Sequence, residues 1–192
     1  MGKIYDGITP ELSRWIGQQH MFFVATAPLA HDGLINCSPK GMDTFRILGP
    51  SEVAYLDLTG SGIETIAHSR ENGRIVFMFC AFDGPPNIVR LHGTSEVHLP
   101  GTPQYEALSA LFPAYRGSRS IVSARLTRIS DSCGYGVPLY RYGGDRNTLI
   151  RWSESKSEEE LAQYREAKNA RSLDGLPGLT AGTPASGDDV DL

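Results

Sequence analysis

The sequence predicts a mainly β fold with short helices, an α+β chain built on one largely antiparallel sheet of six strands. Segments with the residue pattern of strands recur along the first two thirds of the chain. Turn residues and short helices connect them, which favours antiparallel neighbours and a small barrel over a doubly wound parallel sheet. Hydrophobic residues make up 40% of the 192 residues and charged residues 21%, so we expect a soluble globular protein with one core of ordinary size.

Six segments have the composition and alternation of strands. They are 21–26, 33–38, 51–58, 75–82, 87–99 and 120–130. Residues 75–82 are nearly all apolar, as expected for a central strand with both faces covered. In 51–58, Val53 and Tyr55 should point to one side of the sheet, and Ala54 and Leu56 to the other.

Four segments carry signals for a helix start. The predicted helices are 10–19, 61–72, 103–111 and 157–170. The first follows a capping threonine, Thr9, and a proline. The second and the last open on the capping-box patterns Ser61-x-x-Glu64 and Ser157-x-x-Glu160. Residues 156–160 and 165–171 are interpreted as solvent-exposed helix surface.

These elements divide the chain into three regions. Residues 1–132 should form the barrel domain. Residues 133–175, a glycine- and aromatic-rich segment followed by a helix, should pack on the barrel as a C-terminal helical extension. Residues 176–192 lack periodicity and are rich in glycine, proline and aspartate, so we expect a disordered tail.

The charge and cysteine content exclude several classes of partner. A net charge of −4 gives no general attraction to nucleic acid or anionic lipid, so any bound phosphate needs a local site. The three cysteines form no CxxC pair and suit a reducing compartment, and the five histidines lack metal-ligand spacing. No apolar stretch is long enough to span a bilayer. We expect a cytoplasmic protein with no metal, nucleic-acid partner or membrane.

The strongest local signal for a ligand lies where the strand at 51–58 gives way to a helix. Glycines there let the backbone approach a ligand, and free N–H groups at a helix start favour an anion. The candidate ligand-binding residues are Thr59, Gly60, Ser61, Gly62 and Thr65. The alternative is an ordinary capped helix start. The same residues nearly match a dinucleotide fingerprint with Asp83 as the distal acid, but Thr65 replaces the third glycine and hairpins follow.

Two other segments place polar side chains in strands. Asn36, Ser38 and Lys40 project to one face, where they would offer donors and a positive charge to a phosphate or a ring edge. The alternative is an exposed sheet edge with a surface lysine. Arg90 lies in an otherwise apolar strand and needs a partner, either a structural carboxylate or a ligand phosphate.

Taken in order, these segments resemble the pyridoxamine 5′-phosphate oxidase-like, FMN-binding split-barrel superfamily. The resemblance covers about residues 10–130, and it rests on the motifs VATAPLAHDGLINCSPKG, YLDLTGSGIETIAHSREN and RIVFMFCAFDGPPNIVRLHGTSEV. It implies a six-stranded antiparallel split β-barrel and a homodimer with two FMN molecules at the interface.

The resemblance also implies roles for the candidate residues. The strand with Asn36, Ser38 and Lys40 would lie along the flavin, with Lys40 at the ring or the phosphate. The turn from Asp57 to Gly62, with Thr65, would hold the phosphate. Residues 87–90, which include Arg90, would complete the pocket from the partner chain or stabilise the barrel.

Two departures from the oxidase itself affect the expected activity. Gly62 and Ile63 stand where the oxidase has an Arg-Lys pair after the serine of its phosphate turn. The oxidase's C-terminal substrate motif, with its tryptophan and arginine, has no counterpart. Oxidation of pyridoxamine phosphate is therefore not expected.

The resemblance implies an FMN-dependent oxidoreductase that acts on a small molecule of unknown identity. No side chain stands out as a catalytic acid or base, which is compatible with a cofactor that carries out the chemistry. Tyr135 and Arg141 are candidate substrate contacts, although packing and a surface salt bridge are the favoured explanations for them. A non-catalytic flavin store, redox sensor or haem-handling protein on the same fold is an alternative. A structural dimer without a cofactor is another.

Overall fold

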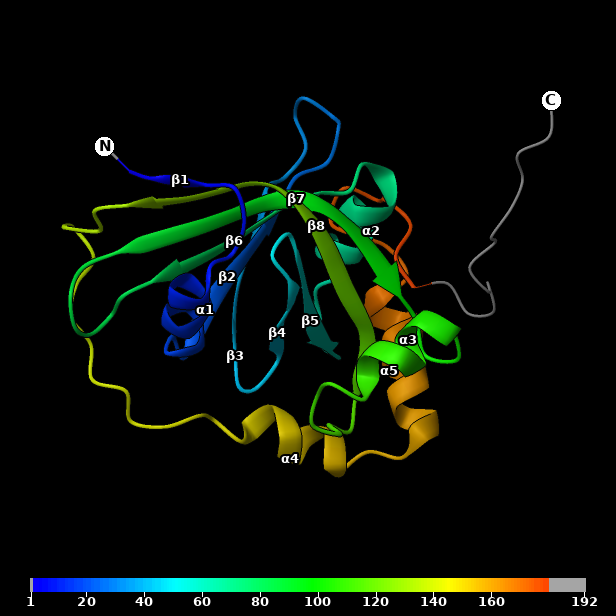
Figure 1. Cartoon of the computed structure of the whole chain (residues 1–192). Helices are drawn as coiled ribbons and strands as arrows, with labels where there is room; N and C mark the ends of the chain where they lie inside the picture. Colours follow the sequence, from blue (N-terminus) through cyan, green and yellow to red (C-terminus); the bar gives the residue numbers. More distant parts are fainter. Residues whose placement is uncertain (1, 180–192) are drawn as a thin grey trace.

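The computed structural model describes residues 2–179, and it confirms a mainly β chain with short helices. Within these residues one curled antiparallel sheet follows the strand order β3-β2-β6-β7-β8-β5-β4, with the short β1 paired to β8 (Figure 1). The strands are β1 (Ile4–Tyr5), β2 (Met21–Thr26), β3 (Asn36–Gly41), β4 (Phe45–Gly49), β5 (Glu52–Leu58), β6 (Arg74–Cys80), β7 (Ile88–His98) and β8 (Ser118–Ser132).

The prediction of six strands is wrong, because the path through the sheet in the described residues has seven. Strand β4 was missed: its sequence, Phe-Arg-Ile-Leu-Gly, does not alternate, and all five residues are half-buried. Strand β3 begins three residues later than the predicted 33–38, because residues 27–35 form a longer loop. Pro39 is tolerated there because β3 is an edge strand.

Every strand pair in the described sheet is antiparallel, which excludes the dinucleotide-binding alternative with its parallel βαβ units. Strands β3 and β4 stand at the two ends of the path and do not pair with each other in the described chain. The curled sheet therefore stays open between β3 and the β4–β5 hairpin. This opening is where the candidate site lies.

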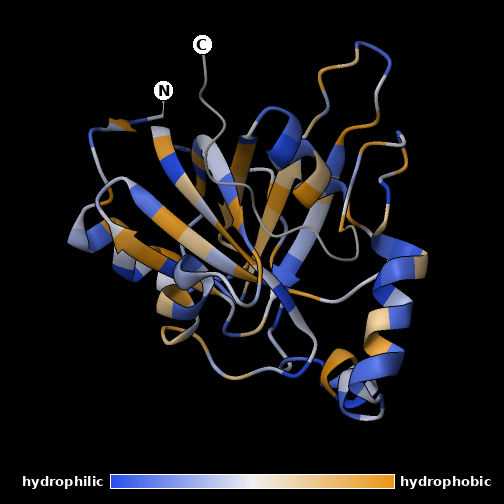
Figure 2. Cartoon of the chain, turned by 90° about the vertical axis from the view of Figure 1, so that its right-hand side faces the viewer, coloured by the Kyte–Doolittle hydropathy of each residue, from blue (hydrophilic) through white to orange (hydrophobic). Residues whose placement is uncertain are grey.

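Two hydrophobic clusters stabilise the sheet. Strand β5 alternates as predicted: Val53 and Tyr55 enter the large aromatic cluster, while Ala54 and Leu56 enter the smaller one. The large cluster fills the concave face of the sheet and includes Phe22 and Phe77. Apolar and hydrophilic residues alternate along the strands in Figure 2. Burial of this kind supplies most of the driving force for the fold.

The helices are α1 (Pro10–Gly17), α2 (Glu64–Glu71), α3 (Pro103–Ser109), α4 (Thr148–Glu154) and α5 (Glu158–Asn169). The predicted cap of α1 is confirmed, since Thr9 accepts a hydrogen bond from the Leu12 N–H. The capping box of α5 is also formed. The capping box of α2 is not: Ile63 occupies the N-cap position, and the Glu64 carboxylate accepts from the Leu173 N–H instead.

The chain after β8 returns to the barrel. Residues 133–147 form no helix or strand, and α4 and α5 follow them. The segment after α5 then folds back, because the N–H groups of Gly178 and Leu179 donate to the carbonyls of Ala170 and Asn169. Residues 176–179 of the predicted tail are therefore ordered, whereas 180–192 lie outside the described residues. No helix in residues 2–179 is long and apolar enough to cross a membrane.

Candidate functional site

A cavity of about 260 Å³ lies in the opening of the sheet, between β3 and the end of β5. Its walls come from β3, the segment that leads into β4, the turn between β5 and α2, and the start of β8. Most of the residues predicted as cofactor-binding line it. They are Asn36, Ser38, Lys40, Thr59, Gly60, Gly62 and Thr65.

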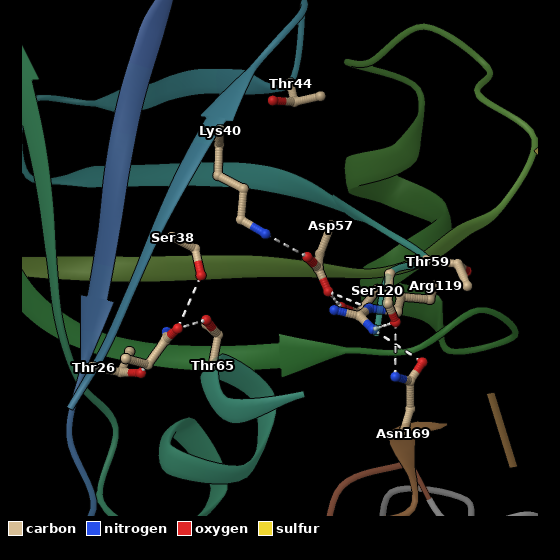
Figure 3. Close-up of polar contacts among 12 residues, drawn as sticks. Thr26, Ser38, Lys40, Thr44, Asp57, Thr59, Thr65, Arg119, Ser120 and Asn169 are labelled. Carbon is tan, nitrogen blue, oxygen red and sulfur yellow. Dashed lines mark hydrogen bonds and ion pairs between the residues drawn. The ribbon is translucent and has the colours of Figure 1, made fainter. Parts of the chain in front are cut away.

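The β3 wall presents alternate side chains to the cavity, as the strand period predicts. Asn36 is held from two sides, because its amide donates to the hydroxyl oxygens of Thr26 (3.1 Å) and Thr65 (3.0 Å). Ser38 donates to the Asn36 side-chain carbonyl at 2.9 Å (Figure 3). These bonds link β3 to β2 and to the start of α2, so the polar groups of this wall are fixed in orientation.

Asp57 lies behind the cavity and joins its two cations. The carboxylate is 1% exposed and pairs with Arg119 Nε at 2.6 Å and with Lys40 Nζ at 3.3 Å (Figure 3). Burial alone would raise the pKa of Asp57, but the charges and hydrogen bonds of Arg119 and Lys40 outweigh it and hold the pKa below its ordinary value. Within this cluster, one carboxylate between two cations leaves a net charge of +1, and Glu64 adds a negative charge elsewhere in the cavity lining.

Arg119 was not predicted, and a local irregularity places it. Asp57 pairs with Ser120 across the β5–β8 ladder, and Leu58 pairs with Ser118, so Arg119 is the extra residue of a β-bulge. A bulge redirects a side chain that alternation would send to the other face. Here it brings the guanidinium of Arg119 beside Asp57 and into the cavity lining. The only signal in the sequence is one arginine among small residues at a strand start.

The turn wall is held from outside by α5. The Thr59 hydroxyl, fully buried, donates to the Gly117 carbonyl at 2.7 Å and accepts from Arg165 Nε at 2.9 Å. Asn169 donates to the Gly60 carbonyl at 2.9 Å and accepts from Arg119 Nη1 at 3.0 Å. The interpretation of 165–171 as solvent-exposed helix surface is wrong for Arg165 and Asn169.

Tyr55 lies under the cavity with a buried hydroxyl that has no hydrogen-bond partner within the described chain. Lys40 Nζ stands 5.8 Å from the centre of its ring. Burial, and then the nearby charge of Asp57, raises the pKa of Tyr55 well above its ordinary range. Tyr55 is therefore a neutral phenol at neutral pH, and its hydroxyl is buried within the protein.

Besides Asp57, which lies behind the cavity, two predicted residues lie outside the cavity lining. Ser61 is exposed, and only its carbonyl takes part in the site, as a weak acceptor (3.4 Å) for Asn169. Arg90 lies on β7, where it donates to the Ser132 hydroxyl at 2.9 Å. Its partner in the chain is thus a hydroxyl and not a structural carboxylate, one of the two partners that the sequence suggested.

A second cavity, of about 530 Å³, adjoins the first. Both cavities are lined by Lys40, near the end of β3, and by Met42, which follows β3. His20 and Tyr142 stack across its mouth with ring centroids 3.6 Å apart. Arg141 lines this cavity, whereas Tyr135 is exposed and does not. The segment after β8 therefore contributes a wall with two tyrosines and several charged residues beside the candidate site.

Comparison with known proteins identifies the family, although no family model matches the chain. The pyridoxamine 5′-phosphate oxidase family protein ustO of Aspergillus flavus is 41% identical over 200 residues, which cover 93% of this chain and 78% of that protein. The chain belongs to the pyridoxamine 5′-phosphate oxidase family. The resemblance found in the sequence is thereby confirmed.

Solved structures agree with this membership at the level of the fold. HupZ of Group A Streptococcus is 25% identical with a TM-score of 0.51, and the match covers 65% of this chain and 99% of that one. A Lactobacillus delbrueckii protein described as a candidate pyridoxamine 5′-phosphate oxidase is 20% identical with a TM-score of 0.52, over 66% and 98%. The part in common is about two thirds of this chain.

The turn between β5 and α2 does not supply the positive charge of the site. Gly62 has no side chain, and Ile63 is 1% exposed and packs in the protein interior. The turn between β5 and α2 therefore offers no cation of its own. The cations at the cavity, Lys40 and Arg119, come instead from β3 and from the bulge in β8.

Proposed function

We propose that the chain is an FMN-binding flavoprotein that works as an oxidoreductase on a small molecule. The observation that carries the proposal is the cavity between β3 and β5, with fixed polar groups on one wall and the Lys40–Asp57–Arg119 cluster, with its net charge of +1, beside the other. Flavin mononucleotide has a polar ring edge at one end and a phosphate at the other. The two walls match these two ends.

The β3 wall suits the ring. Asn36, Ser38 and Lys40 offer an amide, a hydroxyl and an ammonium group along one face of an extended strand. Ring nitrogens and carbonyl oxygens accept hydrogen bonds, and groups fixed in advance lose little entropy on binding. Bound flavin would supply hydride or electron transfer, and these residues would bind and orient it.

The turn wall suits the phosphate. Gly60, Gly62 and Thr65 bring backbone close to the cavity at the start of α2, where N–H groups and the helix dipole favour an anion. The cluster of Lys40, Asp57 and Arg119 adds its net positive charge from below. Glu64 also lines the cavity and keeps its negative charge, although its carboxylate accepts a hydrogen bond from the Leu173 N–H.

The second cavity provides room for a substrate next to the ring. It meets the first at Lys40, and its aromatic wall includes Tyr142 and His20. Charged side chains of both signs line it, including Arg141 and Asp145, which favours a strongly polar substrate. Residues of this chain would thus bind and orient both reactants while the flavin supplies the redox chemistry.

The proposal includes a homodimer. The convex side of β2 and β6 carries the half-buried pair Phe23 and Met78. The loop between β2 and β3 exposes Leu34 and Ile35. Arg90 follows Met78 in register on β7, so its side chain lies on this same side. A second copy packed here would cover the apolar residues and bring Arg90 towards the partner's site. Light scattering after gel filtration measures this state directly.

Spectra of the purified protein test the cofactor and the reaction. We expect flavin absorbance, release of FMN on denaturation, anaerobic bleaching by a reduced nicotinamide nucleotide and recovery of the colour in air. Lys40→Met should weaken FMN binding about tenfold or more, since it removes a charged donor. Lys156→Met, at a surface pair with Glu160, is the matched control and should leave binding unchanged. Failure of the apoprotein to bind FMN at micromolar concentrations would overturn the proposal.

One observation favours a non-catalytic binder as the second candidate. Every ionisable side chain that lines the first cavity is already held by protein groups: Lys40 and Arg119 by Asp57, and Glu64 by Leu173. The bound flavin is exposed to each reduced nicotinamide nucleotide, and then to redox mediators that dithionite sets to physiological potentials. A flavin that stays oxidised in both tests would favour a storage protein over an enzyme. The lining of the first cavity includes neither histidine nor cysteine as an iron ligand, so haem fits this site less well than flavin.

A further inference from the structure

Arg119 has the one guanidinium in the cavity lining, and part of it is still free to bind. Its Nε donates to Asp57, and its Nη1 donates to the Gly60 carbonyl at 3.1 Å and to the Asn169 side-chain carbonyl at 3.0 Å. A guanidinium has five N–H donors, and these bonds use three of them. Nη2, with the remaining two, has no partner among residues 2–179.

The position of this guanidinium is over-determined. The side chain is 6% exposed, and it approaches from a β-bulge, where a backbone irregularity sets its direction. Asp57 holds one edge of the planar group, and the turn carbonyl of Gly60 holds the next. An arginine fixed in this way pays little entropy when it binds an anion, and its planar fork matches two phosphate oxygens.

Asn169 couples the guanidinium to the turn. It is fully buried, its amide donates to Gly60 and its side-chain carbonyl accepts from Arg119. Both ends of one short side chain therefore set the distance between the free edge of Arg119 and the backbone of the turn. Arg165, one helical turn earlier in α5, fixes Thr59 in the same turn.

We propose that Arg119 is the residue that recognises the phosphate of the flavin nucleotide, and that Asn169 is its positioning residue. The inference rests on the proposed function and goes beyond it: it states which group makes the site prefer FMN to riboflavin. The positive charge that Asp57 leaves uncompensated is available to a phosphate and of no use to a neutral ribityl hydroxyl.

The test compares FMN with riboflavin on the full-length apoprotein, by quenching of flavin fluorescence. Unaltered protein should bind FMN at least tenfold more tightly than riboflavin. Arg119→Gln should raise the Kd for FMN by about tenfold to a hundredfold, the loss of one or two charge-assisted hydrogen bonds, and should change the Kd for riboflavin by less than about threefold. Arg125→Gln, an exposed arginine on the same strand, is the matched control.

Asn169→Ala keeps the charge of Arg119 and removes only its support. We expect it to lower the FMN preference about threefold to tenfold, by the net value of one hydrogen bond. The preference should return in part with Asn169→Gln, which can reach the same groups. Circular dichroism and the thermal midpoint identify a variant that fails to fold.

A measurement on unaltered protein decides the matter if both variants misfold. Inorganic phosphate should compete with FMN and should leave riboflavin binding almost unchanged. Three results would overturn the inference and leave the proposed function standing. They are equal affinity for the two flavins, an equal loss of affinity for both flavins in Arg119→Gln, and phosphate that has no effect on FMN binding. Binding of neither flavin would overturn the proposed function itself.

Discussion

The two walls of the cavity are built in opposite ways. The β3 wall is local: Asn36, Ser38 and Lys40 come from one strand and present their polar groups outward from a sheet edge. The turn wall is assembled from distant parts of the sequence. Thr59 and Gly60 meet Arg119 from β8, and Arg165 and Asn169 from α5.

The difference separates binding from support. The polar groups of β3 bond to neighbouring side chains, but the Ser38 oxygen can still accept a hydrogen bond and Lys40 can still donate to a ligand in the cavity. The polar groups of the turn wall are almost all used within the protein, and the Thr59 hydroxyl has no capacity left as a donor. Except at the free edge of Arg119 and its support Asn169, substitutions in the turn wall should therefore reduce stability first, whereas substitutions in β3 should reduce flavin affinity first.

Asp57→Asn should have the largest effect, because it leaves Arg119 and Lys40 without their shared counter-charge. Breaking a buried ion pair by removing one partner costs about 3–5 kcal/mol of folding free energy. Urea unfolding measures the change. Asp43→Asn removes the carboxylate of a more exposed pair with Arg46 and should cost less than about 1 kcal/mol. Equal losses in the two variants would mean that Asp57 gives no special support.

The same carboxylate should make stability depend on pH in the acid range. The folded protein holds the pKa of Asp57 below its ordinary value, so the stabilisation is complete above the unfolded-state pKa, near about 4, and is lost as pH falls below it. Between about pH 5 and pH 3, one pH unit on either side of that value, the unfolding free energy of the unaltered protein should therefore fall more steeply than that of Asp57→Asn. Parallel urea curves across these pH values would contradict the shift.

The sequence predicts the β3 wall well because its information is local. Alternation alone places Asn36, Ser38 and Lys40 on one face, and the structure confirms it although β3 begins later than expected. Glycines and hydroxyls between a strand and a helix likewise indicate the turn at 59–65. The physical reason is that period and turn chemistry depend on neighbouring residues only.

The sequence does not reveal the support of the turn wall. Arg119 reaches the cavity through a bulge, and nothing in the sequence distinguishes a bulged strand from a regular one. Helix α5 has few apolar residues and is charged at both ends, so it has the pattern of a solvent-exposed helix even though Leu161 and Asn169 are buried. Strand β4 was missed for a similar reason, since it lacks alternation. Each of these features depends on tertiary contacts.

Thr59→Val tests the turn wall, and we expect a loss of folding free energy of intermediate size. The isosteric change removes the hydroxyl that donates to the Gly117 carbonyl and accepts from Arg165. Leaving those buried groups without that partner should cost about 1–3 kcal/mol of folding free energy. Thr127→Val, at an exposed hydroxyl on β8, should cost less than about 0.5 kcal/mol. Chemical denaturation of both variants measures the contrast.

Ser38→Ala should have the smallest effect on stability and the clearest effect on binding. The half-buried hydroxyl donates to Asn36 at the cavity wall, so its loss removes one polar group from the wall and loosens another. Flavin affinity should fall by about 0.5–1.5 kcal/mol, which is about twofold to tenfold in Kd, with an unchanged urea midpoint. Cys37→Ala, on the opposite face of the same strand, should leave both quantities unchanged. If Ser38→Ala instead lowered stability as much as Thr59→Val and spared flavin binding, β3 would be a supporting wall too, and the division between the two walls would fail.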